Sequence, residues 1–279
     1  MNAAITVRGL LAAAAGGQTA DEGARDTEML LAHALGRDRA WLYAHADDAL
    51  PVEQAIAFHR LLARRAAGEP IAYLTAHREF WSLDLAVTPA VLIPRAETEL
   101  LVELALQKIP QGAQVDIADL GTGSGAIALA LARERPRARV LASDASVAAL
   151  AVAHGNAQRL RIDNVEFLES DWFAAIGARR FDIVVSNPPY IAENDAHLGQ
   201  GDLRFEPLAA LASGADGLDA IRVLVRAAPA HLKPGGWLLF EHGFDQGPAC
   251  RALLERGGFA DVFTAADLEG RDRVSGGRR

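Results

Sequence analysis

The chain of 279 residues contains a single cysteine, Cys250. One thiol can form neither an internal disulfide bond nor a zinc site built from several cysteines, so the fold has to be stabilised by its core alone. We therefore expect no metal site. A lone cysteine is also compatible with the reducing cytoplasm, where we expect the protein to be found.

Long apolar runs and an excess of positive charge are absent as well. No stretch approaches the roughly 18 consecutive apolar residues that a membrane-spanning helix needs. The formal net charge is −8, which argues against a protein whose affinity comes mainly from neutralising phosphates, because such domains are usually basic. Hydrophobic residues make up 51% of the chain and charged residues 23%, which is typical of a well-packed globular protein.

The pattern of apolar residues changes once along the chain. Residues 1–75 show helical periodicity interrupted by helix breakers, which predicts a small helical bundle. Residues 80–87 alternate apolar and polar side chains, which predicts a strand that residues 88–93 could pair with, so we place a β-hairpin linker at 76–94. Over residues 95–279 helices and strands alternate, which predicts an α/β domain with a parallel sheet covered by helices on both faces. Its strands are expected at residues 115–120, 138–143, 165–168, 181–185, 237–240, 262–264 and 273–275.

A glycine-rich loop, Asp-Leu-Gly-Thr-Gly-Ser-Gly at residues 119–125, joins the first of these strands to a helix. Glycines at such a place let a ligand approach the backbone closely. The spacing differs from the Gly-x-Gly-x-x-Gly that cradles a dinucleotide pyrophosphate, and this favours a ligand without a phosphate at that point. A plain strand-to-helix turn would look the same, so the loop alone does not decide between the two.

The next two strands are followed by polar and aromatic side chains. Asp144 lies about 20 residues beyond the glycines, where a carboxylate can accept hydrogen bonds from both hydroxyls of a ribose. It could instead cap the following helix, but Ser146 is able to fill that role. Asp171 can accept from an exocyclic amino group, and Trp172 can lie against a flat base. Together these positions indicate a nucleoside site.

The predicted strand at residues 181–185 runs into Asn187, Pro188, Pro189 and Tyr190. Two successive prolines fix φ, remove two backbone donors and leave carbonyl acceptors. The side-chain carbonyl of Asn187 and the ring of Tyr190 complete a flat slot that suits a planar –NH₂ group. An amide nitrogen is a poor nucleophile, and a slot that accepts from both N–H groups would make it react by positioning it and by stabilising developing charge.

The Asn-Pro-Pro-Tyr motif is shared by amino-methyltransferases that act on glutamine amides, adenine N6 and cytosine N4. The chain as a whole resembles the release factor glutamine methyltransferase family, and the resemblance covers nearly all of its length. One departure is Ala96, where the family usually has proline. The matching stretches are residues 78–81, 92–95, 97–99, 119–125, 170–173, 187–190, 205–207, 232–236, 241–243 and 272–274.

This resemblance implies a Rossmann-like domain that uses S-adenosylmethionine, with a mixed, mostly parallel sheet, behind an N-terminal helical domain (residues 1–75) that recognises the substrate. It implies methyl transfer to the side-chain amide nitrogen of the glutamine in the Gly-Gly-Gln motif of class I peptide chain release factors. The cofactor would be bound by Gly121, Thr122, Gly123, Ser124 and Gly125 around its methionyl part, by Asp144 at the ribose and by Trp172 at the adenine.

The same resemblance assigns the glutamine amide to residues 187–190. Asn187, Pro188, Pro189 and Tyr190 would bind the substrate; Asn187, Pro188 and Tyr190 would be catalytic, and Asn187 would also contact the cofactor. Glu241 and His242 follow another strand and could serve as a base. We interpret this pair as structural, because a methylated amide loses its proton readily.

Two alternatives remain open. The same pocket could methylate an extruded nucleic-acid base at adenine N6 or cytosine N4, although the net charge and the lack of an insert rich in Lys and Arg argue against direct nucleic-acid binding. The chain could also be a non-catalytic module that binds S-adenosylmethionine, against which the intact Asn-Pro-Pro-Tyr motif speaks. We expect a monomer that has release factors as partners and no association with membranes.

Overall fold

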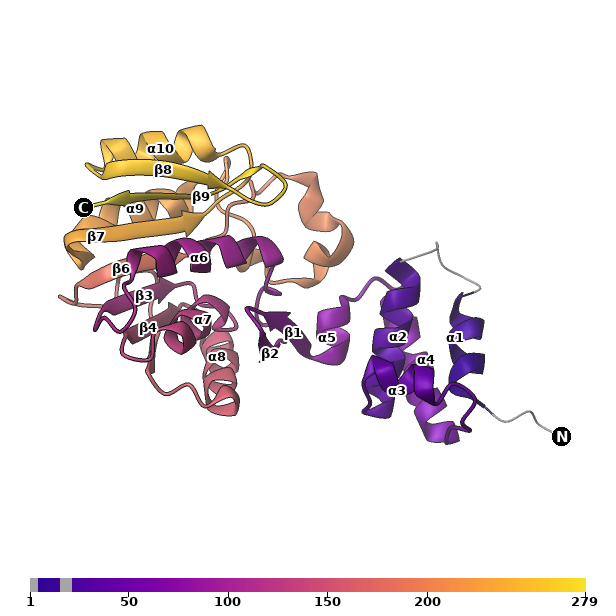
Figure 1. Ribbon diagram of the computed structural model, residues 1–279. Coiled ribbons are helices and arrows are strands. Elements are labelled where there is room, and N and C mark those ends of the chain that lie inside the picture. The colour runs from indigo at the N-terminus through magenta and orange to yellow at the C-terminus, as the bar shows by residue number, and fades with distance from the viewer. Residues whose placement is uncertain (1–4, 16–21) are drawn as a thin grey trace. The chain divides into compact units, whose positions relative to one another are not determined.

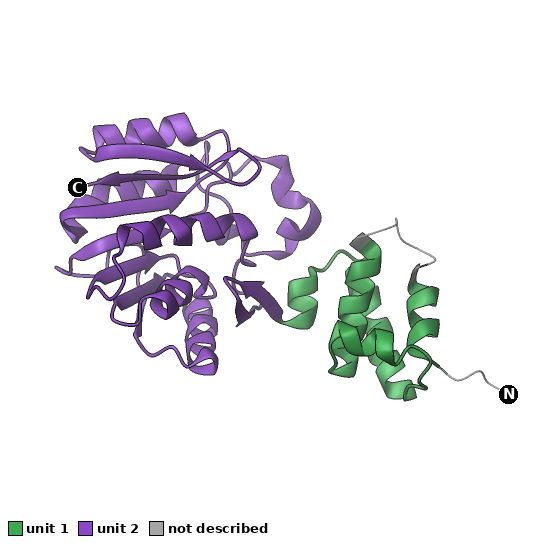
Figure 2. Ribbon diagram, viewed as in Figure 1, with its two compact units in different colours: residues 1–76 green, residues 77–279 purple. Residues whose placement is uncertain are grey.

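The computed structural model describes residues 5–15 and 22–279. The chain divides into two compact units, Met1–Ala76 and His77–Arg279 (Figure 2). Each unit has its own apolar core. Within the described residues no helix combines the length and apolar character needed to cross a membrane.

The first unit is a small helical bundle, as the periodicity of the sequence predicts. Its core is built around Phe58 and the pair Leu30 and Leu31, all with no exposed surface. Asp38 begins the third helix by accepting a hydrogen bond from the backbone N–H of Trp41 at 2.7 Å, which satisfies one of the free donors at a helix start. The helices are α1 (Val7–Ala15), α2 (Glu22–Leu35), α3 (Arg39–Ala44), α4 (Val52–Ala66) and α5 (Ile71–Thr75).

A short antiparallel hairpin opens the second unit, formed by β1 (His77–Phe80) and β2 (Leu83–Ala86). The expectation of one strand over 80–87 paired with 88–93 is therefore wrong. Trp81 and Ser82 both have positive φ, 52° and 55°, which is the backbone of a tight two-residue hairpin turn. The apolar–polar alternation continues through these two residues, but their backbone angles form a turn and the chain reverses there.

The rest of the second unit is a seven-stranded mixed sheet with the order β5-β4-β3-β6-β7-β9-β8 (Figure 1). The five strands from β5 to β7 are parallel, and β9 runs antiparallel to both β7 and β8. This confirms the mixed, mostly parallel sheet that the resemblance implies; the alternation of elements alone predicted only its parallel part. The strands are β3 (Asp116–Leu120), β4 (Arg139–Asp144), β5 (Val165–Glu169), β6 (Phe181–Ser186), β7 (Leu232–Glu241), β8 (Ala260–Ala266) and β9 (Asp272–Arg278).

Helices cover both faces of this sheet, and two apolar clusters mark the faces. Strand β3 shows the alternation that divides them, because Ile117 belongs to the first cluster whereas Ala118 and Leu120 belong to the second. Helices α6 and α7 contribute to the first cluster, and α9 and α10 to the second. The helices are η1 (Ala96–Thr98), α6 (Glu99–Lys108), α7 (Ala126–Glu134), α8 (Val147–Leu160), η2 (Ala196–Gly199), η3 (Gly201–Phe205), η4 (Leu208–Ala210), α9 (Asp219–His231) and α10 (Gly247–Arg256).

The strand expected at residues 237–240 begins earlier than its apolar run. Strand β7 starts at Leu232, which pairs with Phe181, and the next pairing joins Trp237 to Ile183. The intervening Lys-Pro-Gly-Gly segment is accommodated as an irregularity in the register. This segment thus lies inside the strand.

The separate cores lead to a stability prediction. Phe58→Ala should destabilise the N-terminal unit by about 3–5 kcal/mol, because it leaves a cavity in a fully buried site. Hydrogen exchange should then show reduced amide protection in α2 and α4, with protection in β3 and β6 retained. The neighbouring exposed residue supplies a control, Arg60→Ala, which should leave both regions unchanged. Equal loss of protection in both units would contradict independent cores.

Candidate active site

The register of the parallel strands places the ends of four neighbouring strands in one row. Ser143 of β4 pairs with Leu120 of β3, Leu120 pairs with Ser186 of β6, and Ser186 pairs with Phe240 of β7. The residues that follow in the chain are Asp144, Gly121, Asn187 and Glu241. Ligands of open α/β sheets bind at this carboxyl edge.

A cavity of about 720 Å³ lies at this edge, which is a volume typical of a small-molecule site. The predicted residues that line it are Gly121, Thr122, Gly123, Ser124, Asp144, Asp171, Trp172, Asn187 and Pro189. Gly125, Pro188 and Tyr190 are not among the residues of its wall. Thr98 lines the cavity as well; it lies in the stretch 97–99 that matches the family, but no role was predicted for it.

The glycine loop requires glycine for backbone reasons at three positions. Gly121, Gly123 and Gly125 have φ of 73°, 55° and 85°, a region that other residues rarely adopt. A Cβ at Gly125 would lie 3.1 Å from Leu129 and 3.2 Å from Ala153, so this glycine allows α7 and α8 to pack closely. The side chain of Asn156 donates a hydrogen bond to the carbonyl of Ser124 at 2.9 Å and so holds the loop from behind.

Asp144 faces this loop from the end of β4. Its Oδ2 accepts from the backbone N–H of Gly123 at 2.9 Å, and its Oδ1 accepts from that of Ser146 at 2.9 Å. Ser146 is the N-cap of α8, because its hydroxyl accepts from Ala149. The carboxylate is therefore held by two backbone donors, with lone pairs left over for a ligand.

Trp172 occupies a strained backbone position beside the cavity. Its φ is 49°, which is uncommon for a bulky residue. The hydroxyl of Ser170 donates to the Trp172 carbonyl at 2.9 Å and accepts from the N–H of Ala175 at 3.0 Å. These bonds fix the loop, and the ring passes close to the glycine loop, 3.9 Å from where a Cβ of Gly121 would lie.

Asp119 lies beneath the loop and has no exposed surface. Burial raises the pKa of its carboxyl to about 7, although hydrogen bonds from the Thr122 hydroxyl and the Ala128 N–H oppose the rise. Its Oδ1 and the hydroxyl of Ser143 are buried without a hydrogen-bond partner in the described part of the chain. The sequence pattern predicts no separate role for Asp119.

The Asn-Pro-Pro-Tyr loop is fixed at both ends. The Ser186 hydroxyl donates to the carbonyl of Leu120 at 2.7 Å, which ties the end of β6 to that of β3. The carbonyl of Tyr190 accepts from the side chain of Gln246 at 3.0 Å. A Cβ at Gly217 would lie 2.2 Å from that same carbonyl, so only glycine fits there.

Three side chains link this loop to the end of β7. Asn187 donates from Nδ2 to the hydroxyl of Thr98 at 3.2 Å, and Thr98 lies 2.6 Å from Oε2 of Glu241. The hydroxyl of Tyr190 donates to Oε1 of Glu241 at 3.0 Å. Burial raises the pKa of the Glu241 carboxyl and, with the nearby Glu241 charge, that of the Tyr190 hydroxyl. His242 is not part of this group, since it bonds to Ser275 and Gly243.

An ion pair joins two sides of the cavity. Glu206, whose side chain is fully buried, accepts from the N–H of Ile93 at 2.9 Å and from the guanidinium of Arg95. Neighbouring residues on both segments, Pro94 and Pro207, line the cavity. Arg95 has extended backbone before η1, which is the conformation that a residue before proline takes. Ala96 therefore keeps the loop geometry that proline would impose.

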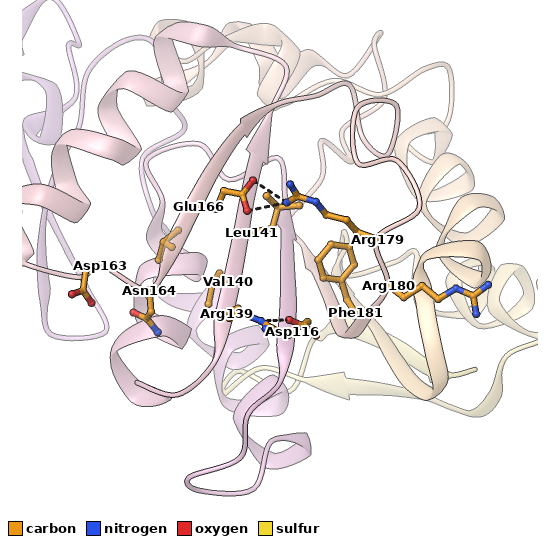
Figure 3. A pocket seen from close by; sticks show the side chains of 11 residues that line it. Asp116, Arg139, Val140, Leu141, Asp163, Asn164, Glu166, Arg179, Arg180 and Phe181 are labelled. Atoms are coloured by element: carbon orange, nitrogen blue, oxygen red, sulfur yellow. Dashed lines mark hydrogen bonds and ion pairs between the residues drawn. The ribbon is translucent and has the colours of Figure 1, made fainter.

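A second cavity of about 540 Å³ lies at the opposite, amino edge of the sheet (Figure 3). Four of its charged side chains form ion pairs within it, Arg179 with Glu166 and Arg139 with Asp116. It contains none of the predicted site residues. Within residues 5–15 and 22–279 no cluster of three or more His, Cys, Asp or Glu is placed to hold a metal ion.

Similarity to known proteins agrees with this geometry. Residues 96–201 match the family model "Methyltransferase small domain", and residues 10–75 match "PrmC N-terminal domain". A release factor glutamine methyltransferase of Xylella fastidiosa is 57% identical over 253 residues, covering 91% of this chain and 92% of its own. The chain belongs to the release factor glutamine methyltransferase family.

Other members of the family are nearly as similar to this methyltransferase. The Pseudomonas aeruginosa member is 52% identical over 91% of both chains, and that of Escherichia coli is 48% identical over 94% of both. Among solved structures, a 16S rRNA N2 methyltransferase of T. thermophilus superposes with a TM-score of 0.55 at 23% identity, over 73% of this chain and 49% of its own. A methyltransferase of Pyrococcus furiosus gives 0.53 at 20% identity, over 77% and 95%. At such low identity these two show the fold.

Asp119 leads to a prediction for stability against pH. Its folded pKa of about 7 lies above the ordinary 3.8, so the folded state holds this proton more tightly than the unfolded state. The stabilisation is fully present below the ordinary pKa and is lost as the pH rises through 7, a change of roughly 4 kcal/mol. Denaturant unfolding at about pH 5 and about pH 8 should show a smaller loss of stability for Asp119→Asn than for the wild type.

The exposed Asp163 provides the control for this measurement, since Asp163→Asn should retain the wild-type difference between the two pH values. Equal pH dependence in Asp119→Asn and the wild type would mean that Asp119 does not titrate between them.

Proposed function

We propose that this methyltransferase transfers a methyl group from S-adenosylmethionine to the side-chain amide nitrogen of the glutamine in the Gly-Gly-Gln motif of class I peptide chain release factors. The hydrogen bonding of the Asn187 side chain at the cavity supports this proposal most directly. Its Nδ2 is engaged by Thr98, and within the described residues its Oδ1 accepts no hydrogen bond. It is therefore free to accept from a substrate –NH₂ group.

The cavity has the features that S-adenosylmethionine needs. Nothing lies within 4 Å of where a Cβ of Gly123 would be, so a ligand can contact the loop backbone. Asp144 offers carboxylate lone pairs to ribose hydroxyls, and Trp172 offers a ring face to adenine. In our assignment the loop of Gly121, Thr122, Gly123, Ser124 and Gly125 holds the methionyl part. When bound, the cofactor supplies an electrophilic methyl group on a sulfonium.

The residues of the chain act on the glutamine by positioning it. Asn187 Oδ1 and the carbonyl of Pro188 accept from the two N–H groups, Pro189 shapes the slot, and the ring of Tyr190 flanks the amide plane. Acceptors at both N–H groups stabilise the positive charge that develops on nitrogen as the new bond forms. The methylated amide then loses a proton, which needs no strong base.

We assign substrate recognition to the helical domain at residues 1–75, with 76–94 linking it to the methyltransferase domain at 95–279. The net charge of −8 disfavours direct nucleic-acid binding. The enzyme therefore binds the release factor itself and not a nucleic acid. The protein acts as a monomer in the cytoplasm, where release factors work.

Asn187→Ala should lower turnover by about 10²–10³, by analogy with the loss of one preorganised hydrogen-bonding group. Mass spectrometry of a release factor after incubation with the enzyme and S-adenosylmethionine measures the added methyl group on the Gly-Gly-Gln glutamine. The exposed Asn194 gives the control, and Asn194→Ala should retain wild-type turnover. Methylation of duplex DNA or ribosomal RNA in place of the release factor would favour the nucleic-acid alternative.

Asp144→Ala should weaken S-adenosylmethionine binding by roughly 10–100-fold, since hydrogen bonds to a charged group are worth about 1.5–3 kcal/mol. Trp172→Ala should cost a similar factor through lost stacking on adenine. Isothermal titration gives both dissociation constants, with Asp163→Ala as the control at the opposite edge of the sheet. An unchanged constant for Asp144→Ala removes the ribose role, and no binding by the wild type removes the cofactor assignment.

A further inference from the structure

The carboxyl group of Glu241 is buried without a direct ion pair. The residue is 1% exposed and ends β7, in the same row as Asn187. It forms no ion pair in the described part of the chain; the nearby Arg273 is paired with Asp267 instead. A buried charge without a cation destabilises a fold unless hydrogen bonds compensate. A carboxylate at this position therefore needs an explanation beyond packing.

Each carboxyl oxygen of Glu241 accepts a hydrogen bond from one hydroxyl group. Thr98 approaches Oε2 at 2.6 Å, and Tyr190 approaches Oε1 at 3.0 Å. Thr98 precedes α6 and lines the cavity. One carboxylate thus holds two elements that lie far apart in the sequence.

The proton inventory of Thr98 then decides the orientation of Asn187. A threonine hydroxyl has a single proton, and here Thr98 uses it to donate the hydrogen bond to Oε2 of Glu241. The Thr98 oxygen is left as an acceptor toward Asn187, so the NH₂ side of the Asn187 amide must face it, as it does at 3.2 Å. Because the amide is planar with O and N on different sides, Oδ1 is directed elsewhere.

We propose that Glu241 is a positioning residue for methyl transfer, which through Thr98 fixes the Asn187 amide with its oxygen toward the substrate nitrogen. This rests on the proposed function of the slot. Without the carboxylate, Thr98 could donate to Asn187 Oδ1, and the amide would then present its NH₂ group to the substrate –NH₂. Two donors would face each other, and the slot would lose its aimed acceptor.

The Glu241→Gln variant tests this directly. The introduced amide keeps the shape of the side chain but has an NH₂ group that donates. The hydroxyls of Thr98 and Tyr190 are then no longer both forced to act as donors. We expect turnover with release factor to fall by about 10², close to the effect of Asn187→Ala, with the Kd of S-adenosylmethionine unchanged. An enzyme with wild-type turnover would overturn the proposal.

A double-mutant cycle separates positioning through Asn187 from a general structural role. If Glu241 acts through Asn187, adding Glu241→Gln to Asn187→Ala lowers turnover no further. If the two losses multiply, Glu241 acts independently and the proposal fails. Ser275→Ala is the matched control, because it removes a buried hydroxyl that is hydrogen-bonded to His242, the residue after Glu241. It should retain turnover even where it lowers the melting temperature.

Thr98 gives a second test if Glu241→Gln does not fold. Thr98→Ser keeps the hydroxyl and should retain turnover, whereas Thr98→Val keeps the shape, removes the hydroxyl and should lose turnover as Glu241→Gln does. Equal activity of the two variants would exclude the relay through Thr98.

The orientation of the Asn187 amide can be measured without substrate, and therefore independently of the proposed function. In NMR spectra of the wild type, the side-chain NH₂ protons of Asn187 should show a nuclear Overhauser effect to the Thr98 methyl group, and Glu241→Gln should abolish it. A wild type that shows this effect but methylates no release factor refutes the proposed substrate. Retention of the effect in Glu241→Gln refutes the positioning role.

Discussion

The hydrogen-bonded register of four parallel strands is the constraint on which the site depends. Pairing of Ser143, Leu120, Ser186 and Phe240 sets the ends of β4, β3, β6 and β7 side by side, at about 4.8 Å from strand to strand. The acidic residue of β4, the glycine loop of β3 and the asparagine of β6 then meet at one edge. A slip of one residue in any strand would turn its end away from the cavity.

Polar groups are buried at this edge only where a second residue compensates them. Asp144 accepts from two backbone N–H groups, and Glu206 accepts from Arg95 and Ile93. Asp119 and Ser143 are the exceptions, since Oδ1 of Asp119 and the Ser143 hydroxyl have no hydrogen-bond partner in the described residues, and burial raises the pKa of the Asp119 carboxyl. The site thus combines rigidly held acceptors with one carboxyl that titrates near neutral pH.

Local sequence patterns were sufficient for most of the fold. The apolar run at 115–120 and the glycines after it predicted β3 and its loop, because a buried parallel strand and a tight turn each leave a signature within a few residues. The strands of the hairpin, β1 and β2, were misplaced because the prediction also relied on a local pattern. The alternation of residues 80–87 is local, but the reversal at Trp81 and Ser82 depends on backbone angles for which neither residue type is a signal.

The sequence by itself determined which chemical groups stand at the strand ends: a glycine loop, Asp144, Trp172 and the Asn-Pro-Pro-Tyr segment. Only the tertiary structure decided how they are held. Thr98 and Glu241 are 143 residues apart, and Arg95 and Glu206 are 111 apart. Contacts across such separations leave no periodic pattern in the chain, because they arise from the packing of whole elements. The orientation of the Asn187 amide depends on which group the Thr98 hydroxyl donates to. That is decided only when the fold brings Thr98 and Glu241 together.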